Sequence, residues 1–164
     1  MYDCISWINR NYKKSGCNTF EKLFRFWSSF YITTFENQAK KWAVRKGMRQ
    51  EKVAIVNVYE LSEEWDDFTV LSFEKENEKW LDFVCACRKG QPINKEYDII
   101  IGNVADDDVF KTVDMYFRGL WDKEKVLEEL RYYKMNNQIC IVNQEALNRL
   151  ITFKRAYEVE NNGR

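Results

Sequence analysis

The chain of 164 residues is 45% hydrophobic and 32% charged, a composition that suits a single globular domain with a core. Its 26 basic and 26 acidic side chains cancel, so charge gives no case for a nucleic-acid or membrane partner. Histidine is absent, which excludes His-containing catalytic triads, His-ligated zinc and a histidine general base. An enzyme with this sequence must therefore work with carboxylates, amides, tyrosines or thiols.

The cysteine usage and the N-terminal sequence predict a reduced, cytoplasmic protein. The five cysteines are an odd number without the short secreted context of a disulfide framework. Cys85 and Cys87, the close pair, are separated by one residue, whereas a zinc knuckle has two residues between its cysteines. We therefore expect structural cysteines and no metal site. The first residues lack the apolar segment of a secretory signal, and no run of about 18 apolar residues predicts a membrane span.

Patterns of hydrophobicity predict strands and helices after residue 29. The predicted strands are rich in β-branched and aromatic residues and cover 30–34, 52–61, 67–73, 97–105 and 137–143. The predicted helices repeat apolar residues at helical spacing and cover 36–47, 74–89, 106–119, 121–134 and 144–153. Gly47 is the expected stop of the first helix, and Asp122 is the expected N-cap of the fourth. This irregular alternation favours an α+β fold over a doubly wound sheet.

Four segments of the chain occur in the order found in one family of proteins. They are FYITTFENQAKKWA from Phe30, WLDFVCACR from Trp80, YDIIIGNVADDDVF from Tyr97 and NNQICIVNQEALNRL from Asn136. Over about residues 30–157 the chain resembles an uncharacterised bacterial domain-of-unknown-function family, which is grouped with the ADP-ribosyltransferase superfamily. The resemblance implies an ADP-ribosyltransferase-like split mixed and antiparallel sheet with flanking helices, and NAD as the substrate.

The resemblance also implies roles for individual residues. Tyr31 falls on the second-strand tyrosine that stacks on the nicotinamide ring, and Trp42, eleven residues later, would cover the other face of that ring. Thr33, on the strand of Tyr31, joins them as a cofactor-binding residue. Gln138 falls on the position of a glutamate that hydrogen-bonds the ribose 2′-hydroxyl, so Gln138 and Tyr31 are the expected catalytic residues. A glutamine can accept that bond but cannot balance the developing positive charge, which predicts slow chemistry or a changed target.

Each of these residues could instead have a purely structural role. Tyr31 and Trp42 would also serve as core aromatics, and Gln138 at the head of a buried strand could satisfy backbone groups instead of a ligand.

Several charged residues have two interpretations as well. Asp98, Asp106 and Asp107 could bind a ligand, although the acidic run from Asp106 to Asp108 most simply caps a helix N-terminus. Arg88 could meet the pyrophosphate of NAD, or it could form a surface ion pair.

These features predict an ADP-ribosyltransferase-like domain that, in its intact form, transfers ADP-ribose from NAD to a macromolecule. Small cytoplasmic domains of this superfamily in bacteria often act as toxins held by a partner, so an antitoxin or an acceptor protein is the expected partner. Two alternatives stay open: a non-catalytic binding module that kept the fold, and an NAD glycohydrolase that uses water as the acceptor. A membrane or a nucleic acid is not an expected partner.

Residues 1–29 depart from the family pattern. The family begins with Tyr-His-Gly-Ser and enters its second strand through Phe-Gly-x-Gly-Phe, whereas this chain has neither and places Trp27 where a tight glycine turn is expected. We therefore divide the chain into a divergent or out-of-frame segment (1–29), a domain (30–157) and a tail (158–164). We expect the first strand to be degraded or missing, and NAD binding by this chain to be weak or absent.

The genetic code offers an explanation for this departure. Tryptophan is always encoded by TGG, so a one-base shift at Trp7, which precedes an isoleucine, forces a glycine codon. Trp27 yields a second glycine when Ser28 is encoded by AGY. With ordinary codon choices the shifted frame contains Tyr-His-Gly-Ser and an Asp-Phe-Gly-Ala-Gly that runs directly into Phe30. A genuinely divergent N-terminus is the alternative.

The nucleotide sequence tests the frameshift hypothesis. We expect Ser6 to be encoded by TCA, because only this serine codon spells the histidine in the neighbouring frame, and Ser28 by AGY, because AGC spells the alanine of Asp-Phe-Gly-Ala-Gly. Other codons at these two serines would show that residues 1–29 are a genuine N-terminus.

Overall fold

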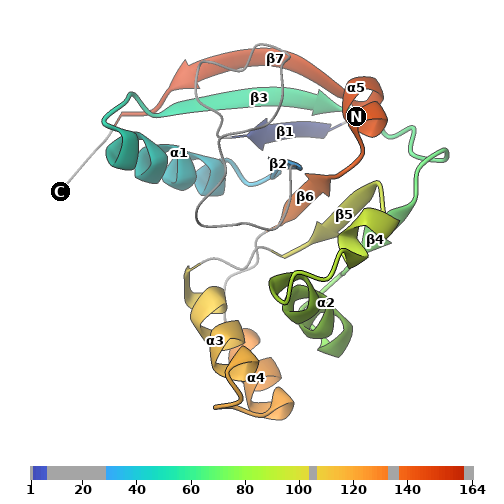
Figure 1. Cartoon of the computed structure of the whole chain (residues 1–164). Coiled ribbons are helices and arrows are strands. Elements are labelled where there is room, and N and C mark those ends of the chain that lie inside the picture. Colours follow the sequence, from blue (N-terminus) through green and yellow to red (C-terminus); the bar gives the residue numbers. More distant parts are fainter. Residues whose placement is uncertain (1, 7–28, 104–106, 133–136, 161–164) are drawn as a thin grey trace.

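The computed structural model describes residues 2–6, 29–103, 107–132 and 137–160, which form seven strands and five α-helices (Figure 1). The strands are β1 (Tyr2–Ser6), β2 (Phe30–Ile32), β3 (Ile55–Leu61), β4 (Val70–Ser72), β5 (Ile99–Gly102), β6 (Gln138–Ile141) and β7 (Ile151–Glu158). The helices are α1 (Glu36–Gln50), α2 (Glu78–Arg88), α3 (Asp107–Phe117), α4 (Lys123–Leu130) and α5 (Gln144–Leu150). A 3-10 turn, Ile93–Glu96, lies between α2 and β5.

The strands form two sheets. A three-stranded antiparallel sheet has the order β1-β3-β7, and a four-stranded sheet has the order β2-β6-β5-β4. The second sheet is mixed, because β4 and β5 are parallel while the β2–β6 and β5–β6 pairs are antiparallel. Figure 1 shows α1 under the three-stranded sheet, α2 beside β4 and β5, and α3 with α4 as a pair farther from both sheets. The predicted α+β class, with a split mixed sheet and flanking helices, is confirmed.

The first strand is present, which corrects the expectation that it would be degraded or missing. β1 pairs antiparallel with β3, from Tyr2 opposite Leu61 to Ser6 opposite Asn57. Strand pairing uses the backbone N–H and C=O groups that every residue except proline carries, so the side-chain composition of this segment does not prevent it. Residues 1 and 7–28 of the predicted divergent segment lie outside the described residues.

A strand replaces the end of the last predicted helix and the start of the predicted tail. α5 ends at Leu150, and β7 begins at Ile151 and pairs with β3 as far as Glu158. Ile151 and the two residues after it are β-branched or aromatic, so they favour a strand once a partner is present. That partner lies far earlier in the sequence, which is why local apolar spacing alone predicted a helix to residue 153.

Gly47 does not end the first helix, which continues to Gln50 and is followed by Glu51 in the left-handed conformation (φ 53°). Gly47 lies inside the helix, where the chain that enters β3 passes close to it. A Cβ atom on Gly47 would lie 2.7 Å from the Lys52 carbonyl oxygen and 3.2 Å from the Ala54 nitrogen. The glycine therefore permits close packing and does not serve as a helix stop.

Buried side chains of the described residues form three hydrophobic clusters. The first joins both sheets and α5 and contains Phe30, Ile32, Leu61, Ile99, Ile139, Ile141, Ala146 and Leu150. The second joins α2, α3 and α4 and contains Trp80, Leu81, Cys85, Val109, Val113, Val126 and Leu130. The third lies between α1 and β3 and contains the small residues Ala39, Ala43, Ala54 and Val56. Small side chains let α1 approach the sheet closely.

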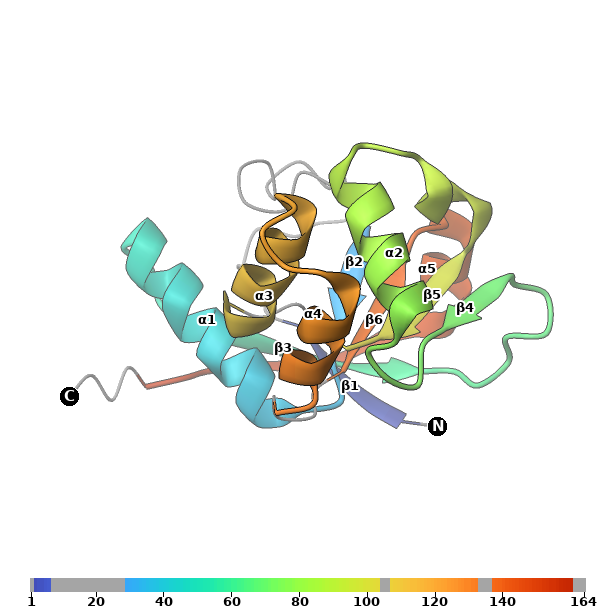
Figure 2. The same ribbon diagram turned by 90° about the horizontal axis from the view of Figure 1, so that it is seen from below.

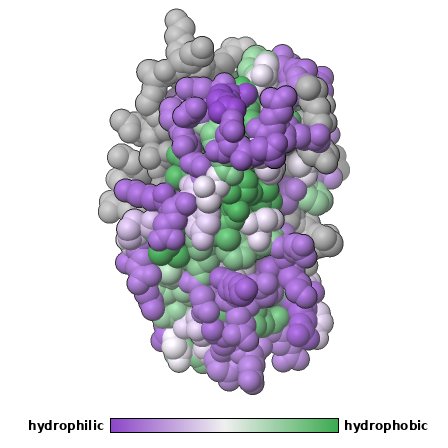
Figure 3. Space-filling model, turned by 90° about the vertical axis from the view of Figure 1, so that its right-hand side faces the viewer, coloured by the Kyte–Doolittle hydropathy of each residue, from purple (hydrophilic) through white to green (hydrophobic). Residues whose placement is uncertain are grey.

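The side of the molecule that carries α5 and β4 shows hydrophobic surface between two polar regions (Figure 3). Trp65, Phe68 and Val70 pack against the first cluster but are only partly buried. Within the described ranges, no helix combines the length and the apolar character needed to cross a bilayer.

We expect Gly47→Ala to destabilise the protein by about 1–3 kcal/mol, because the added Cβ meets backbone atoms. In an ordinary helix interior the same change stabilises by about 1 kcal/mol, so the sign of the effect tests the close approach. Urea unfolding measures it, with Lys41→Ala on the exposed face of α1 as a control that should change little. A gain in stability for Gly47→Ala would contradict the close approach.

Candidate functional site

The pairing of β2 with β6 brings three of the predicted site residues onto one face of the four-stranded sheet. Tyr31 lies opposite Cys140, and Ile32 lies opposite Ile139. Because side chains alternate along a strand, Tyr31 and Cys140 face away from the first cluster, to which Ile32 and Ile139 belong. By the same alternation Thr33 and Gln138 share the face of Tyr31. We call this surface the Tyr31 face.

Helices α1 and α2 border the Tyr31 face. On one side, Tyr31 packs with Trp42 of α1 against the third cluster. On the other side, Cys87 of α2 lies near Cys140, whose presence helps to raise the pKa of Cys87. Figure 2 shows α3 and α4 between α1 and α2 when the molecule is seen from below.

Tyr31 and Trp42 are both half-buried and pack against the same small cluster. The Arg45 guanidinium also lies 5.9 Å from the centre of the Trp42 ring. This shared packing is what the core-aromatic interpretation expects. It also keeps the Trp42 ring of α1 close to the Tyr31 ring of β2, as the nicotinamide interpretation requires.

Gln138 is the first residue of β6 and lies opposite Gly102 of β5. It is half-buried, and its carboxamide makes no hydrogen bond to any described residue. The alternative that this side chain satisfies backbone groups therefore finds no support in the described structure.

Asn137, which the sequence interpretation missed, joins the end of β2 to the start of β6. Its Oδ1 accepts hydrogen bonds from the Thr33 hydroxyl (2.9 Å) and the Thr34 backbone N–H (3.0 Å), and its Nδ2 donates to the Thr34 hydroxyl (2.7 Å). Its backbone oxygen accepts from Nε2 of Gln38 in the first turns of α1 (2.9 Å). An asparagine before a strand carries no periodic signal, so only the hydrogen bonds reveal this role.

The Asn137 network has consequences for Thr33 and Gln38. Thr33 is buried, and its hydroxyl donates to Asn137 while accepting from the Phe35 backbone N–H (3.1 Å), so a contact with a ligand would require this pairing to change. The Oε1 atom of Gln38 is buried and has no hydrogen-bond partner in the described structure. A buried acceptor without a donor is unfavourable and indicates a place where a ligand or water could donate.

The three cysteines whose side chains the structure describes are poor nucleophiles. Cys85, Cys87 and Cys140 are free and buried. Burial raises the pKa of Cys87 and Cys140 to about 12, and it also raises the pKa of Cys85. These thiols stay protonated at neutral pH, which agrees with a structural role. In the described residues, no group of three or more Cys, Asp or Glu side chains is arranged to hold a metal ion.

For the acidic residues that could bind a ligand or serve the fold, the structure describes the side chain of Asp98 alone. The Asp98 carboxylate accepts from the Thr69 backbone N–H (2.8 Å) and from Nδ2 of Asn143 (2.6 Å), so it joins loops beside β5. Asp106 and the side chains of Asp107 and Asp108 lie outside the described residues.

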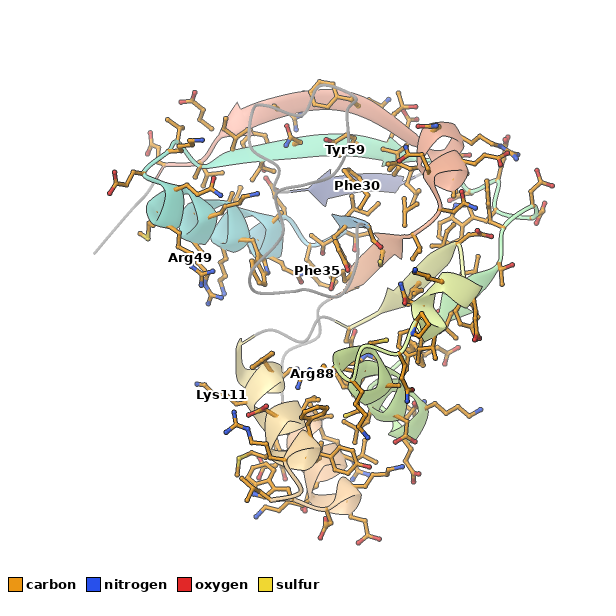
Figure 4. The ribbon with its side chains drawn as sticks, viewed as in Figure 1. Phe30, Phe35, Arg49, Tyr59, Arg88 and Lys111 are labelled. Atoms are coloured by element: carbon orange, nitrogen blue, oxygen red, sulfur yellow. The ribbon has the colours of Figure 1, made fainter. Side chains whose placement is uncertain are left out.

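Arg88 does not form the surface ion pair that one interpretation expected. It makes no ion pair with a described residue, and its guanidinium lies 4.3 Å from the centre of the Phe110 ring. Figure 4 shows Arg88 between α2 and α3, and Phe35 beside β2.

The family model described as "Protein of unknown function (DUF3990)" matches residues 13–153. The chain belongs to this family. The predicted membership of an uncharacterised domain-of-unknown-function family is thereby confirmed. The DUF3990 match includes the Tyr31 face, Asn137 and Arg88, and it also includes residues 13–29 of the segment predicted to diverge. No curated protein and no solved structure matches the chain.

We expect Asn137→Ala to lower the free energy of unfolding by about 1–3 kcal/mol, because the partly buried Thr33 hydroxyl and the exposed Thr34 backbone N–H lose their acceptor. Hydrogen exchange of the Ile32 and Ile139 amides should become faster, since Asn137 secures the end of their pairing. Asn148→Ala is the control, because among the described residues the Asn148 side chain accepts a single, exposed bond from Gln144. Equal stability of the two variants would contradict the proposed role of Asn137.

Proposed function

We propose that this DUF3990 domain is ADP-ribosyltransferase-like and, in its intact form, transfers ADP-ribose from NAD to a macromolecule. One observation carries the proposal: Tyr31 and Gln138 share a face of two neighbouring strands, two register positions apart, beside the helix that bears Trp42. The resemblance requires this arrangement of the ring-stacking tyrosine and the residue that contacts the ribose. Without the β2–β6 register the two side chains would not share a face of the sheet.

The chemistry that these side chains offer fits NAD in part. The Tyr31 ring supplies an apolar, stacking surface for a planar nicotinamide. The carboxamide of Gln138, which bonds to no described residue, supplies an acceptor for a ribose hydroxyl, and Oε1 of Gln38, which has no partner in the described structure, supplies another near the β2–β6 junction. As the glycosidic bond weakens, positive charge develops on the ribose, and a neutral amide stabilises it less well than a carboxylate.

The intact form differs from this chain at the end of β1. In the shifted frame the histidine of Tyr-His-Gly-Ser falls at the position of Ser6, which lies opposite Asn57 in the β1–β3 pair. That histidine would supply the ribose contact that the resemblance expects from the first strand. This chain carries a serine there, which is why we expect it to bind NAD weakly or not at all.

A non-catalytic binding module is the second candidate. The neutral Gln138 and the absence of histidine from the chain both favour it. An NAD glycohydrolase would use the same groups with water as the acceptor. In the cell, a cytoplasmic antitoxin or the acceptor protein would be the partner of the leading candidate.

Labelled NAD distinguishes the candidates when it is incubated with the frame-restored protein and with this chain. We expect label on a macromolecule with the restored protein and little or none with this chain. Free ADP-ribose would favour the glycohydrolase, and binding without turnover, followed by tryptophan fluorescence, would favour the binding module. Absence of NAD binding by the restored protein would overturn the proposal.

Two variants of the restored protein sharpen the test. Tyr31→Ala should abolish NAD binding, whereas Tyr132→Ala, a change at a tyrosine that is 78% exposed at the end of α4, should leave it unchanged. Gln138→Glu should raise turnover by about tenfold or more, because a carboxylate at this position balances the developing charge. Unchanged turnover in Gln138→Glu would argue against a catalytic position.

A further inference from the structure

Strand β7 ends the three-stranded sheet, so one of its edges pairs with no described strand. The sheet has the order β1-β3-β7, and Figure 1 shows β7 as its outermost strand. β7 is eight residues long, whereas the other strands at a sheet edge, β1, β2 and β4, have five, three and three residues. Short edge strands are a common protection against pairing with another chain, and β7 lacks it.

The hydrogen bonds at the two ends of the β3–β7 pair show which backbone groups of β7 point outward. The Ser62 N–H donates to the Leu150 oxygen at 2.9 Å, and the Val159 N–H donates to the Ala54 oxygen at 2.9 Å. Along an antiparallel pair, residues that bond to the partner strand alternate with residues that do not. The alternation can therefore be followed along β7 from each end.

Phe153 and Ala156 are residues of β7 that do not bond to β3. They lie opposite Tyr59 and Asn57, and each lies an odd number of positions from the bonded residue at its end of the strand. Their N–H and C=O groups consequently point to the outer edge, where both residues are exposed. Such groups are a template for an additional strand from another molecule.

A row of aromatic rings leads from the core to this edge. The Phe30 and Tyr59 rings meet edge to face with their centres 5.3 Å apart, and the Tyr59 and Phe153 rings do so at 5.7 Å. Phe30 is 8% exposed, whereas Phe153, at the end of the row, is 56% exposed. A large apolar side chain opposite Phe153 on an added strand would continue the row and bury this ring.

The middle of the edge carries positive charge. The register of the β3–β7 pair shifts between Val58 and Tyr59, which leaves Lys154 as an extra residue in a bulge. Lys154 pairs with Glu60, whereas Arg155 is exposed and makes no ion pair with a described residue. An acidic side chain on an added strand would give Arg155 an opposite charge.

A second copy of this chain fits the edge poorly. A two-fold axis would pair Phe153 of each copy with Ala156 of the other, because these residues carry the outward groups. Lys154 and Arg155 lie between them, so the positive charges of the two copies would meet. Like charges opposite each other are destabilising, and a partner with acidic residues avoids this repulsion.

We propose that the outer edge of β7 binds an extended segment of a partner protein as an additional strand. The segment has a large apolar residue opposite Phe153, an acidic residue that faces Arg155, and a second apolar residue opposite Ala156. Phe153 and Ala156 share one face of the sheet and Arg155 lies on the other, so alternating side chains of the segment meet them in turn. No residue of the Tyr31 face takes part, so this inference does not depend on the proposed function.

Amide hydrogen exchange of this chain, followed by NMR with and without a blocked peptide, tests the proposal. The probe peptide is Thr-Phe-Glu-Val-Glu-Thr, and its control has both glutamates replaced by lysine. We expect the probe to slow exchange at Phe153 and Ala156 and to leave Tyr157, whose N–H bonds to β3 by the same alternation, unchanged. The lysine peptide should bind about fivefold or more weakly, because it meets Arg155 with a like charge.

Variants at Ala156 separate edge pairing from other contacts. Ala156→Pro removes the outward N–H but none of the bonds between β7 and β3, so probe affinity should fall about fivefold or more. Ala156→Ser keeps the N–H and is the matched control, which should bind as the unmodified chain does. Arg155→Glu should reverse the preference between the two peptides. Melting temperatures of the variants without peptide show whether each one folds.

Several results would overturn the inference. If Ala156→Pro does not fold, exchange in the unmodified chain still decides, because absence of slowing at Phe153 and Ala156 would contradict strand addition. Equal binding of the two peptides would contradict an acidic partner, and unchanged affinity in folded Ala156→Pro would place the peptide elsewhere. Slowing of the same amides with protein concentration alone would identify a second copy as the occupant.

Discussion

The antiparallel pairing of β2 with β6 joins segments that are far apart in the chain and determines where the candidate site residues lie. Thr33 and Asn137, whose side chains meet at the end of this pair, are separated by 104 residues in the sequence. A shift of the register by one residue would turn the side chains of one strand to the opposite face of the sheet, so Tyr31 and Gln138 would no longer share a face. Asn137 opposes such a shift, because its side chain and backbone both bond to the segment that follows β2.

The same pairing separates an apolar core from a polar face. Phe30 and Ile141 belong to the cluster that joins the two sheets, while Tyr31 and Gln138 lie on the opposite face, bordered by helices. The helices reach this face in different ways. Alanines let α1 approach closely with Trp42, whereas α2 and α3 meet through larger side chains and enclose Arg88 beside Phe110.

Features with a local cause were predicted from the sequence. Asp122 caps α4 through a 2.8 Å bond from the Lys125 N–H, as a short acceptor side chain before a helix should. Features that depend on a distant partner were missed or mistaken. β1 and β7 form because β3 lies between them, and Gly47 is needed because the Lys52 carbonyl oxygen passes close to it. The candidate site divides in the same way: resemblance indicated Tyr31 and Gln138, whereas nothing local marked Asn137.

By itself the sequence determined the α+β class, most of the helices and strands, and the family, because side-chain periodicity, caps and matched segments are properties of neighbouring residues. Only the tertiary structure decided that the Gln138 carboxamide bonds to no described residue, that the Thr33 hydroxyl donates to Asn137, and that Arg88 lies against an aromatic ring and pairs with no described acid. Burial and hydrogen-bond partners depend on which distant segments the fold brings together. The residue types at a site can therefore be predicted from sequence, but their availability for binding cannot.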